Sequence, residues 1–277
     1  MEQAGAKVGS SMESALAPLI IPWEVLRTQL NSLMPLRRSL WILVFTVVFA
    51  VSARLLRGVT VSGAVAGGVL AFLLFFGGGP GAFAVLITVF LLTFTSTRTG
   101  QRRKRQLVTA EEHRGRSASQ VFANIGIASA AAMVSLASRH PAAWLVASAA
   151  ALAEAAADTA SSELGQALSE SAYLITDFRR VPVGTDGGIS AAGTLAGVAA
   201  SLVIATVSCA TRSIAWHWLL PVAAAGVLGM FVDSFLGASL ERRRLLNNDA
   251  VNLLSTLLAA CFALLLYWAR DGEFRLP

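Results

Sequence analysis

Residues 149–165 read AAALAEAAADTASSELG, an alanine-rich apolar run that holds three acidic residues, Glu154, Asp158 and Glu163. Eight of the first twelve residues of this run are alanine. An ionisable side chain inside a membrane-spanning helix is costly, and by default it marks a functional site. The run therefore predicts a membrane helix that carries part of a functional site.

The composition of the whole chain favours an integral membrane protein over a soluble domain. The chain has 277 residues, of which 55% are hydrophobic and 14% charged. A helix needs roughly 17–25 apolar residues to cross a bilayer. The sequence offers about eight such segments and predicts an all-α, polytopic transmembrane helical bundle, with spans at residues 40–56, 59–77, 80–97, 118–138, 142–165, 190–210, 217–238 and 250–269.

Two regions are expected: an N-terminal tail, residues 1–38, and an integral-membrane domain, residues 39–277, that carries the catalytic residues. Within the tail, residues 13–35 combine an apolar face with Glu24 and Arg27. This mixture is typical of a helix that lies in the membrane interface. A disordered tail or a packing arm fits the same residues equally well, so we assign no chemistry to them.

Basic residues predict which side of the membrane the polar segments face. Residues 96–117, STRTGQRRKRQLVTAEEHRGRS, carry seven Lys and Arg residues, and short loops of this kind stay in the cytoplasm. Alternation of the spans places residues 166–189 and 241–249 on the same side. Only Arg37 and Arg38 disagree, which leaves the orientation of the first span open.

This topology predicts a site that faces the cytoplasm, and the short loops favour a prokaryotic plasma membrane. The formal net charge of +6 reflects the basic loops, so no nucleic-acid partner is expected.

Three polar residues recur at helical spacing where the fourth segment begins. Arg116, Gln120 and Asn124 are four residues apart, which places them on one face of a helix. A guanidinium group with two amides can hold phosphate oxygens or orient metal-bound water. Hydrogen bonding between helices explains the Gln and Asn equally well.

The acidic run itself forms a polar stripe. Glu154, Asp158, Ser161, Ser162 and Gly165 share one face, whereas Glu163 lies about 140° round the helix from Asp158 and is expected to pair with a different neighbour. Carboxylates beside hydroxyl groups suit Mg²⁺, which uses one or two carboxylates and takes its other oxygens from water and phosphate. The alternative is a buried carboxylate held by an arginine or by backbone groups.

A polar loop and a glycine-rich turn follow the stripe. Arg179 and Arg180 can hold phosphate through two hydrogen bonds each, or they can reach the lipid head groups. In the turn GTDGGIS, residues 184–190, the glycines allow close backbone approach, and the helix that follows offers free N–H donors to an anion. Either Thr185 or Ser190 can cap that helix. The turn lacks the lysine of a P-loop, and no strand precedes it.

A second aspartate lies late in the chain. Asp233 stands between Gly229 and Gly237 at a spacing of four, which lets another helix or a ligand approach it. The pair Asp233-Ser echoes Asp158-Thr and hints at an internal duplication with one aspartate from each half. Two asparagines, Asn248 and Asn252, follow where the last span begins.

Five motifs occur in a fixed order: GRSASQVFAN, AADTASSELG, RRVPVGTDGGISAAGT, VDSFLGASLE and LNNDAVNLLS. Together they resemble the integral-membrane family of transmembrane protein 19 and the plant phytyl-phosphate kinase, over roughly residues 35–270. The resemblance implies a phosphotransferase that converts an isoprenyl monophosphate to the diphosphate with a nucleoside triphosphate, CTP being favoured. Two positions depart from the family pattern: Asp186 stands where asparagine is expected, and Ile125 where glycine is expected.

The resemblance and the residues together give a hypothesis for the site. Mg²⁺ would be held by Asp158 and Asp233, and Asp158, Glu163 and Asp233 would be the catalytic residues. The partners would be an isoprenyl monophosphate, a nucleoside triphosphate and the lipid bilayer. Substrate or phosphate binding is expected from Arg116, Gln120, Asn124, Ser161, Ser162, Arg179, Arg180, Thr185, Gly187, Gly188, Ser190, Asn248 and Asn252.

A second class of function fits the same acidic residues. An ion-coupled transporter would bind Na⁺ or H⁺ through buried Asp158 and Asp233 near the middle of the membrane. Both aspartates fall toward the cytoplasmic ends of their segments, which favours the enzyme.

Overall fold

The computed structural model describes residues 23–106 and 115–271. Its side chains are described from Leu36 to Lys104 and from Gly115 to Arg270. The interfacial helix predicted within residues 13–35 therefore lies outside the described side chains.

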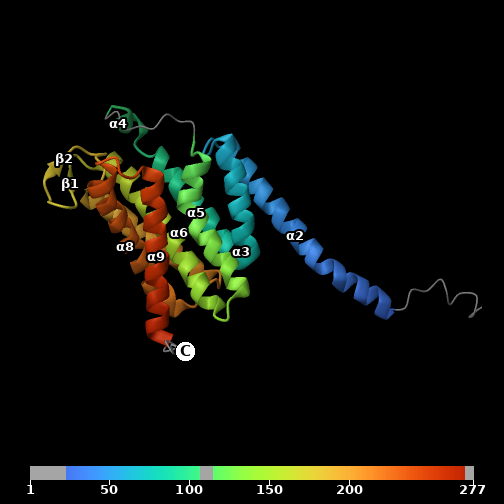
Figure 1. The fold of residues 1–277 in the computed structure, drawn as a ribbon. Coiled ribbons are helices and arrows are strands. Elements are labelled where there is room, and N and C mark those ends of the chain that lie inside the picture. Colours follow the sequence, from blue (N-terminus) through green and yellow to red (C-terminus); the bar gives the residue numbers. More distant parts are fainter. Residues whose placement is uncertain (1–22, 107–114, 272–277) are drawn as a thin grey trace, which may run out of the picture. The chain divides into compact units, whose positions relative to one another are not determined.

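The chain divides into two units, Met1–Val44 and Phe45–Pro277, and the second unit holds helices α3 to α9 (Figure 1). The elements in chain order are α2 (Trp23–Leu55), α3 (Val61–Arg98), α4 (Gln101–Gln106), α5 (Ala118–Ala137), α6 (Pro141–Leu168), β1 (Ala172–Leu174), β2 (Arg180–Val181), β3 (Gly188–Ile189), α7 (Ala191–Ala210), the 3₁₀ turn η2 (Trp216–Trp218), α8 (Leu219–Leu236), the π-helical turn η3 (Gly237–Glu241) and α9 (Asn248–Asp271).

The protein is a polytopic transmembrane helical bundle, as predicted. Within the described residues, six helices are long and apolar enough to cross a membrane. One of them, α3, is interrupted at Gly79, whose φ of 74° and ψ of −173° are not helical. The rings of Phe75 and Phe83 stack across this break with centroids 4.7 Å apart, so the two halves of α3 fold back on one another. The halves correspond to the predicted spans 59–77 and 80–97.

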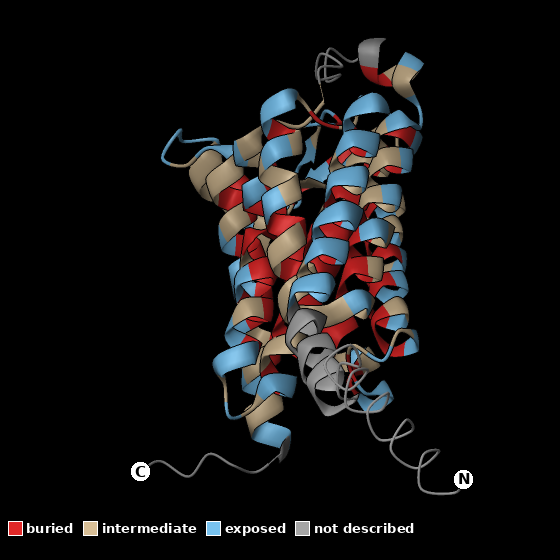
Figure 2. Ribbon diagram, turned by 90° about the vertical axis from the view of Figure 1, so that its right-hand side faces the viewer, coloured by how far each residue is buried: buried red, intermediate tan, exposed pale blue. Residues whose placement is uncertain are grey.

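The acidic, alanine-rich helix α6 is the centre of the bundle. It packs against α3, α5, α7, α8 and α9, and its alanine side chains are almost all buried. Buried residues gather in the interior of the bundle (Figure 2). Small side chains let neighbouring helices approach closely in a membrane. At Gly193 of α7, for example, an added Cβ would lie only 2.6 Å from the backbone oxygen of Ser161. Helix α6 is not one of the six apolar helices, and it carries the acidic residues Glu154, Asp158 and Glu163.

A small antiparallel sheet interrupts the helical pattern after α6. Its strand order is β2-β1-β3, and it lies with α4 at one end of the bundle (Figure 1). The sequence analysis did not predict this sheet, because strands of two or three residues are too short to show a period. The sheet positions the turn before α7, where Gly187 has a φ of +73° and lies against η3. A Cβ at Gly187 would collide with Ala238.

Aromatic side chains gather at the other end of the bundle, where α6 and α8 begin and α9 ends. The rings of Trp218 and Tyr267 stack with their centroids 5.0 Å apart. The rings of Trp268 and His140 meet edge to face with their centroids 4.8 Å apart. Tryptophan and tyrosine are enriched where a membrane meets water. This cluster is consistent with a membrane boundary on the side away from the sheet.

Candidate functional site

A polar cavity of about 620 Å³ opens at the end of the bundle that carries the sheet. The helices α5, α7 and α9 begin at this end, and α6 and α8 end there. Of the predicted site residues, Asp158, Glu163, Asp233, Arg116, Gln120, Asn124, Ser161, Ser162, Thr185, Gly187, Gly188, Ser190, Asn248 and Asn252 line the cavity.

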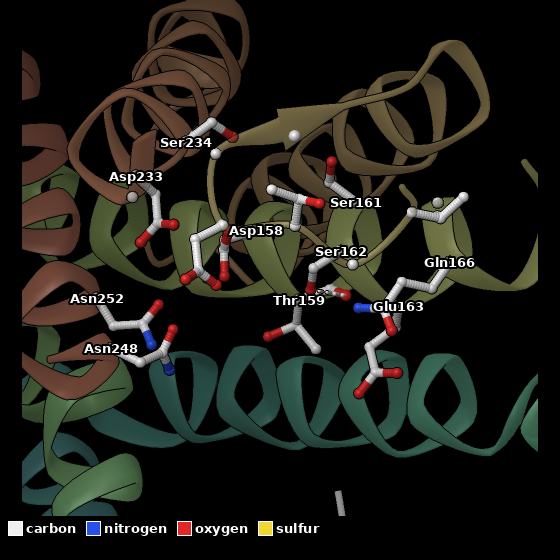
Figure 3. A pocket seen from close by; sticks show the side chains of 18 of the residues that line it. Asp158, Thr159, Ser161, Ser162, Glu163, Gln166, Asp233, Ser234, Asn248 and Asn252 are labelled. Atoms are coloured by element: carbon white, nitrogen blue, oxygen red, sulfur yellow. Dashed lines mark hydrogen bonds between the residues drawn. The ribbon is translucent and has the colours of Figure 1, made fainter. Parts of the chain in front are cut away.

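The two aspartates meet in this cavity from different helices. Asp158 of α6 and Asp233 of α8 project toward one another (Figure 3). The hydroxyl of Ser255 donates to Oδ2 of Asp233 at 3.2 Å, and the Arg116 guanidinium interacts electrostatically with Asp158. Two segments 75 positions apart in the chain thus supply one carboxylate each, as the sequence hypothesis required.

A third carboxyl group lies below the pair, deeper in the bundle. Glu154 is one helical turn before Asp158, and only 1% of it is exposed. Its Oε1 accepts no hydrogen bond from any described residue. Gly229 of α8 makes room for it, because a Cβ at that position would collide with the Glu154 side chain.

Glu163 points away from the aspartates, toward α3 and α4 (Figure 3). Its Oε2 accepts from Lys104 Nζ at 2.5 Å, and its Oε1 accepts from Thr97 Oγ1 at 2.9 Å. Lys104 is 4% exposed and also donates to the backbone oxygens of Ser96 and Thr97. Glu163 therefore has the separate partner that its place on the helix predicted, and it holds α4 beside the cavity.

Arg116 is held by its backbone as well as by its side chain. Its N–H donates to the oxygen of Gly58, and its oxygen accepts from the N–H of Thr60, each at 3.0 Å. Its guanidinium donates to Thr159 Oγ1 at 3.1 Å. The residue precedes α5 rather than lying within it, yet it still faces the cavity.

The amides predicted beside Arg116 also make local hydrogen bonds. Gln120 and Ser117 form a capping box at the start of α5, in which Gln120 Oε1 accepts from the Ser117 N–H at 2.8 Å. Asn124 Nδ2 donates to the backbone oxygen of Gln120 at 2.8 Å. Helix capping thus accounts for part of the periodic pattern, and both side chains remain in the cavity wall.

The glycine-rich turn caps α7 through only one of the two expected residues. Ser190 Oγ accepts from the Gly193 N–H at 3.2 Å, whereas Thr185 Oγ1 donates to the backbone oxygen of Pro182 at 2.7 Å. The N–H of Gly188 donates to the Thr185 oxygen at 2.8 Å, so that amide is used within the turn.

The contact of Arg179 and Arg180 with a substrate phosphate stays a prediction. Neither residue lines the cavity. Arg180 belongs to β2, which pairs with β1, and Arg179 forms an exposed ion pair with Asp177 at 3.4 Å. Their spacing along the sequence could not show that Arg180 belongs to a strand.

Three helix N-termini contribute to the cavity. Gln120 lies in the first turn of α5, Ser190 caps α7, and Asn248 begins α9. The unpaired N–H groups and the positive dipole end of a helix favour an anion. Asn247 caps α9 by accepting from the Ala250 N–H at 2.9 Å, and Asn248 and Asn252 of this helix line the same cavity as Asp158 (Figure 3).

The charged lining is mostly acidic. Several of its members were not predicted: Lys104 stood among many basic residues of one loop, and Glu241 follows Asp233 by eight positions through a π-helical turn. The described charged residues in the wall are the acids Asp158, Glu163, Asp186, Asp233, Glu241 and Asp249 and the bases Lys104 and Arg116.

This donor set fits Mg²⁺ better than a metal ion that is bound entirely by protein. Among the described residues, no group of three His, Cys, Asp or Glu side chains is arranged to hold a metal ion. Mg²⁺ does not need such a group, because it is bound through one or two carboxylates together with water and phosphate. Asp158 and Asp233 face each other and supply two carboxylates.

Comparison with known proteins gives matches along most of the chain. A family model described as "Integral membrane protein DUF92" matches residues 44–260. An uncharacterized membrane protein of Methanocaldococcus jannaschii is 31% identical over 74% of this chain and 84% of its own length. An uncharacterized membrane protein of Synechocystis is 32% identical over 66% of this chain and 72% of its own length.

A plant relative matches over a shorter stretch. The chloroplastic protein VTE6 of Arabidopsis thaliana is 38% identical over 39% of this chain and 34% of its own length. No solved structure matches the chain significantly.

Proposed function

We propose that this chain, which belongs to the DUF92 family of integral membrane proteins, is an isoprenyl-phosphate kinase embedded in the membrane. It would transfer the terminal phosphoryl group of a nucleoside triphosphate, with CTP favoured, to an isoprenyl monophosphate. The observation that carries this proposal is the convergence of Asp158 and Asp233 in one polar cavity at the end of an apolar bundle.

The position of the cavity suits a substrate with two unlike ends. A polar head can enter from the aqueous side, while an isoprenyl tail remains among the apolar helices. The basic loops predict that this side is the cytoplasm, where nucleotides are available. The five motifs that resemble the phytyl-phosphate kinase family supply most of the cavity wall.

The chemistry needs positioning and charge neutralisation more than covalent help. An oxygen of the acceptor monophosphate attacks the γ-phosphorus, the bond from that phosphorus to the β-phosphate oxygen breaks, and a nucleoside diphosphate leaves. The acceptor is already an anion and needs no strong general base. Arg116 and the N-termini of α5, α7 and α9 are placed to hold phosphate oxygens.

Asp158 and Asp233 are the residues that would hold Mg²⁺ in this proposal. When bound, Mg²⁺ neutralises charge on the donor phosphates. The acidic wall gives a reason why a cation would be required, since the carboxylates would otherwise repel an entering polyphosphate.

Ion-coupled transport remains the second candidate because of Glu154. With this buried carboxyl group, the acidic side chains continue from the two aspartates one helical turn deeper into the bundle, as a path for an ion would require. Against it, the cavity lies where α5, α7 and α9 begin, whereas a transporter site is expected near the middle of the spans.

A product assay with purified protein in detergent tests the proposal. Geranylgeranyl or phytyl monophosphate would be incubated with CTP, ATP, GTP or UTP, with Mg²⁺ or with a chelator, and the products analysed by mass spectrometry. The kinase predicts a diphosphate that requires Mg²⁺ and one preferred donor. Folded protein that gives no diphosphate with any donor, but carries an ion flux in vesicles, would favour the transporter.

A further inference from the structure

An apolar pocket of about 80 Å³ lies beside the polar cavity and has no role in the function proposed above. It is bounded by the last turns of α2, both halves of α3 and the start of α5. Two residues, Arg116 and Asn124, line both the pocket and the polar cavity. Arg116 and Asn124 therefore form the wall between the two spaces.

Small residues create this pocket. Those in its wall are Ala50, Ala53, Gly58, Gly63, Ala64 and Gly67. Gly63 is required by the backbone, because a Cβ there would collide with the Arg116 oxygen. Gly67 is different, since a Cβ at that position would make only an ordinary contact of 3.6 Å with Val121. A larger side chain at residue 67 would therefore fill the pocket and leave the backbone in place.

We propose that this pocket binds the part of an isoprenyl tail that lies nearest to the phosphate. The inference rests on the proposed function for the identity of the ligand. The Arg116 guanidinium donates to Thr159, which lines the polar cavity, so a phosphate bound by Arg116 lies on the cavity side. The carbon chain attached to that phosphate then enters the apolar side.

The volume limits how much of the tail the pocket holds. A cavity of about 150 Å³ holds one benzene molecule. A pocket of about 80 Å³ is about half that size, so it holds no more than one isoprene unit and not a chain of four. The remainder of the tail lies outside the pocket, in the bilayer.

Such a pocket positions the substrate more than it strengthens binding. Lipid tails are as apolar as leucine, so moving an isoprene unit from the bilayer into the protein gains little. Fixing the first unit does fix the direction of the phosphate, and orientation of reacting groups is a large part of catalysis. The pocket would also distinguish branched isoprenyl phosphates from straight alkyl phosphates by shape.

The test combines kinetics with photolabelling. Gly67→Leu fills the pocket, and Ala64→Val narrows it with a smaller change. Val65→Leu is the matched control, because Val65 lies on the same helix but is 66% exposed. Thermal unfolding in detergent shows that each variant is folded. The label is geranylgeranyl monophosphate with a diazirine in its first isoprene unit, and cross-links are located by mass spectrometry.

We expect labelling of α3 and α5 beside the pocket in the wild type, and its loss in Gly67→Leu. The ratio kcat/KM for geranylgeranyl monophosphate should fall about tenfold in Gly67→Leu, as for other pockets altered by a few carbons, and stay unchanged in Val65→Leu. Labelling of the wild type at other helices would overturn the inference. So would folded Gly67→Leu and Ala64→Val proteins that are labelled as strongly as the wild type.

The two proposals can fail separately. If Gly67→Leu forms the diphosphate as fast as the wild type and keeps the same labels, the pocket assignment is wrong and the kinase stands. If the wild type is labelled in the pocket but forms no diphosphate, the kinase is wrong and the pocket remains a site for an isoprenyl phosphate.

Discussion

Replacement of Lys104 by methionine should destabilise the protein by breaking a largely buried ion pair. The ammonium group of Lys104 lies 2.5 Å from Glu163 Oε2, and the two side chains are 5% and 22% exposed. Removing one partner of a fully buried pair costs about 3–5 kcal/mol. Glu163 is partly exposed and keeps its hydrogen bond from Thr97, so we expect about 2–3 kcal/mol.

Thermal unfolding in detergent measures this loss. For a chain of this size, 1 kcal/mol corresponds to about 2–4 °C in Tm, so Lys104→Met should lower Tm by about 4–12 °C. The double variant Lys104→Met with Glu163→Gln should recover much of the loss, because it leaves no unpaired carboxylate. Arg102→Met serves as the control, since Arg102 is an exposed residue of the same short helix, and its Tm should stay within about 2 °C of the wild type.

Two results would refute this reasoning about Lys104. One is an unchanged Tm for Lys104→Met. The other is a double variant that loses as much stability as both single variants added together, since that would mean that the two side chains do not interact.

Three further predictions concern the cavity wall. Gly187→Ala should lower Tm by several degrees, because Gly187 has a φ of +73° and a Cβ there would collide with Ala238; a Tm equal to that of the wild type would show that η3 moves aside. Ser190→Ala should cost about 1 kcal/mol by removing the cap of α7, seen as faster hydrogen exchange at Gly193, and unchanged exchange would contradict the cap. Arg116→Met should raise KM for the isoprenyl phosphate more than KM for the nucleotide, whereas equal changes in both would argue against contact with the acceptor.

The sequence was sufficient to predict the bundle and many of the residues that line the cavity, because helical spacing is informative in apolar segments. Asp158, Ser161 and Ser162 share a face of α6, and all three line the cavity. Asp233 could be assigned to the same site from the motif it shares with Asp158. Their meeting across α6 and α8 depends on tertiary packing, which helical periodicity does not describe.

The remaining features depend on short or irregular backbone. The sheet after α6 has strands of two or three residues, and neither Arg180 of β2 nor Arg179 before it lines the cavity. Lys104 could not be separated from the other basic residues of its loop, although it is buried against Glu163. The apolar pocket arises from small residues of α2, of α3 and of the loop between them, a combination that no single helical pattern reveals.

The central claim is that Asp158 and Asp233 serve a phosphoryl transfer. The most direct test incubates purified variants with geranylgeranyl monophosphate, Mg²⁺ and CTP that carries a radioactive γ-phosphate. Asp177→Asn is the matched control, because Asp177 is an exposed aspartate outside the cavity wall. The account predicts labelled diphosphate from the wild type and Asp177→Asn, and about 100-fold less or none from folded Asp158→Asn and Asp233→Asn. Equal labelling by all four proteins would contradict it.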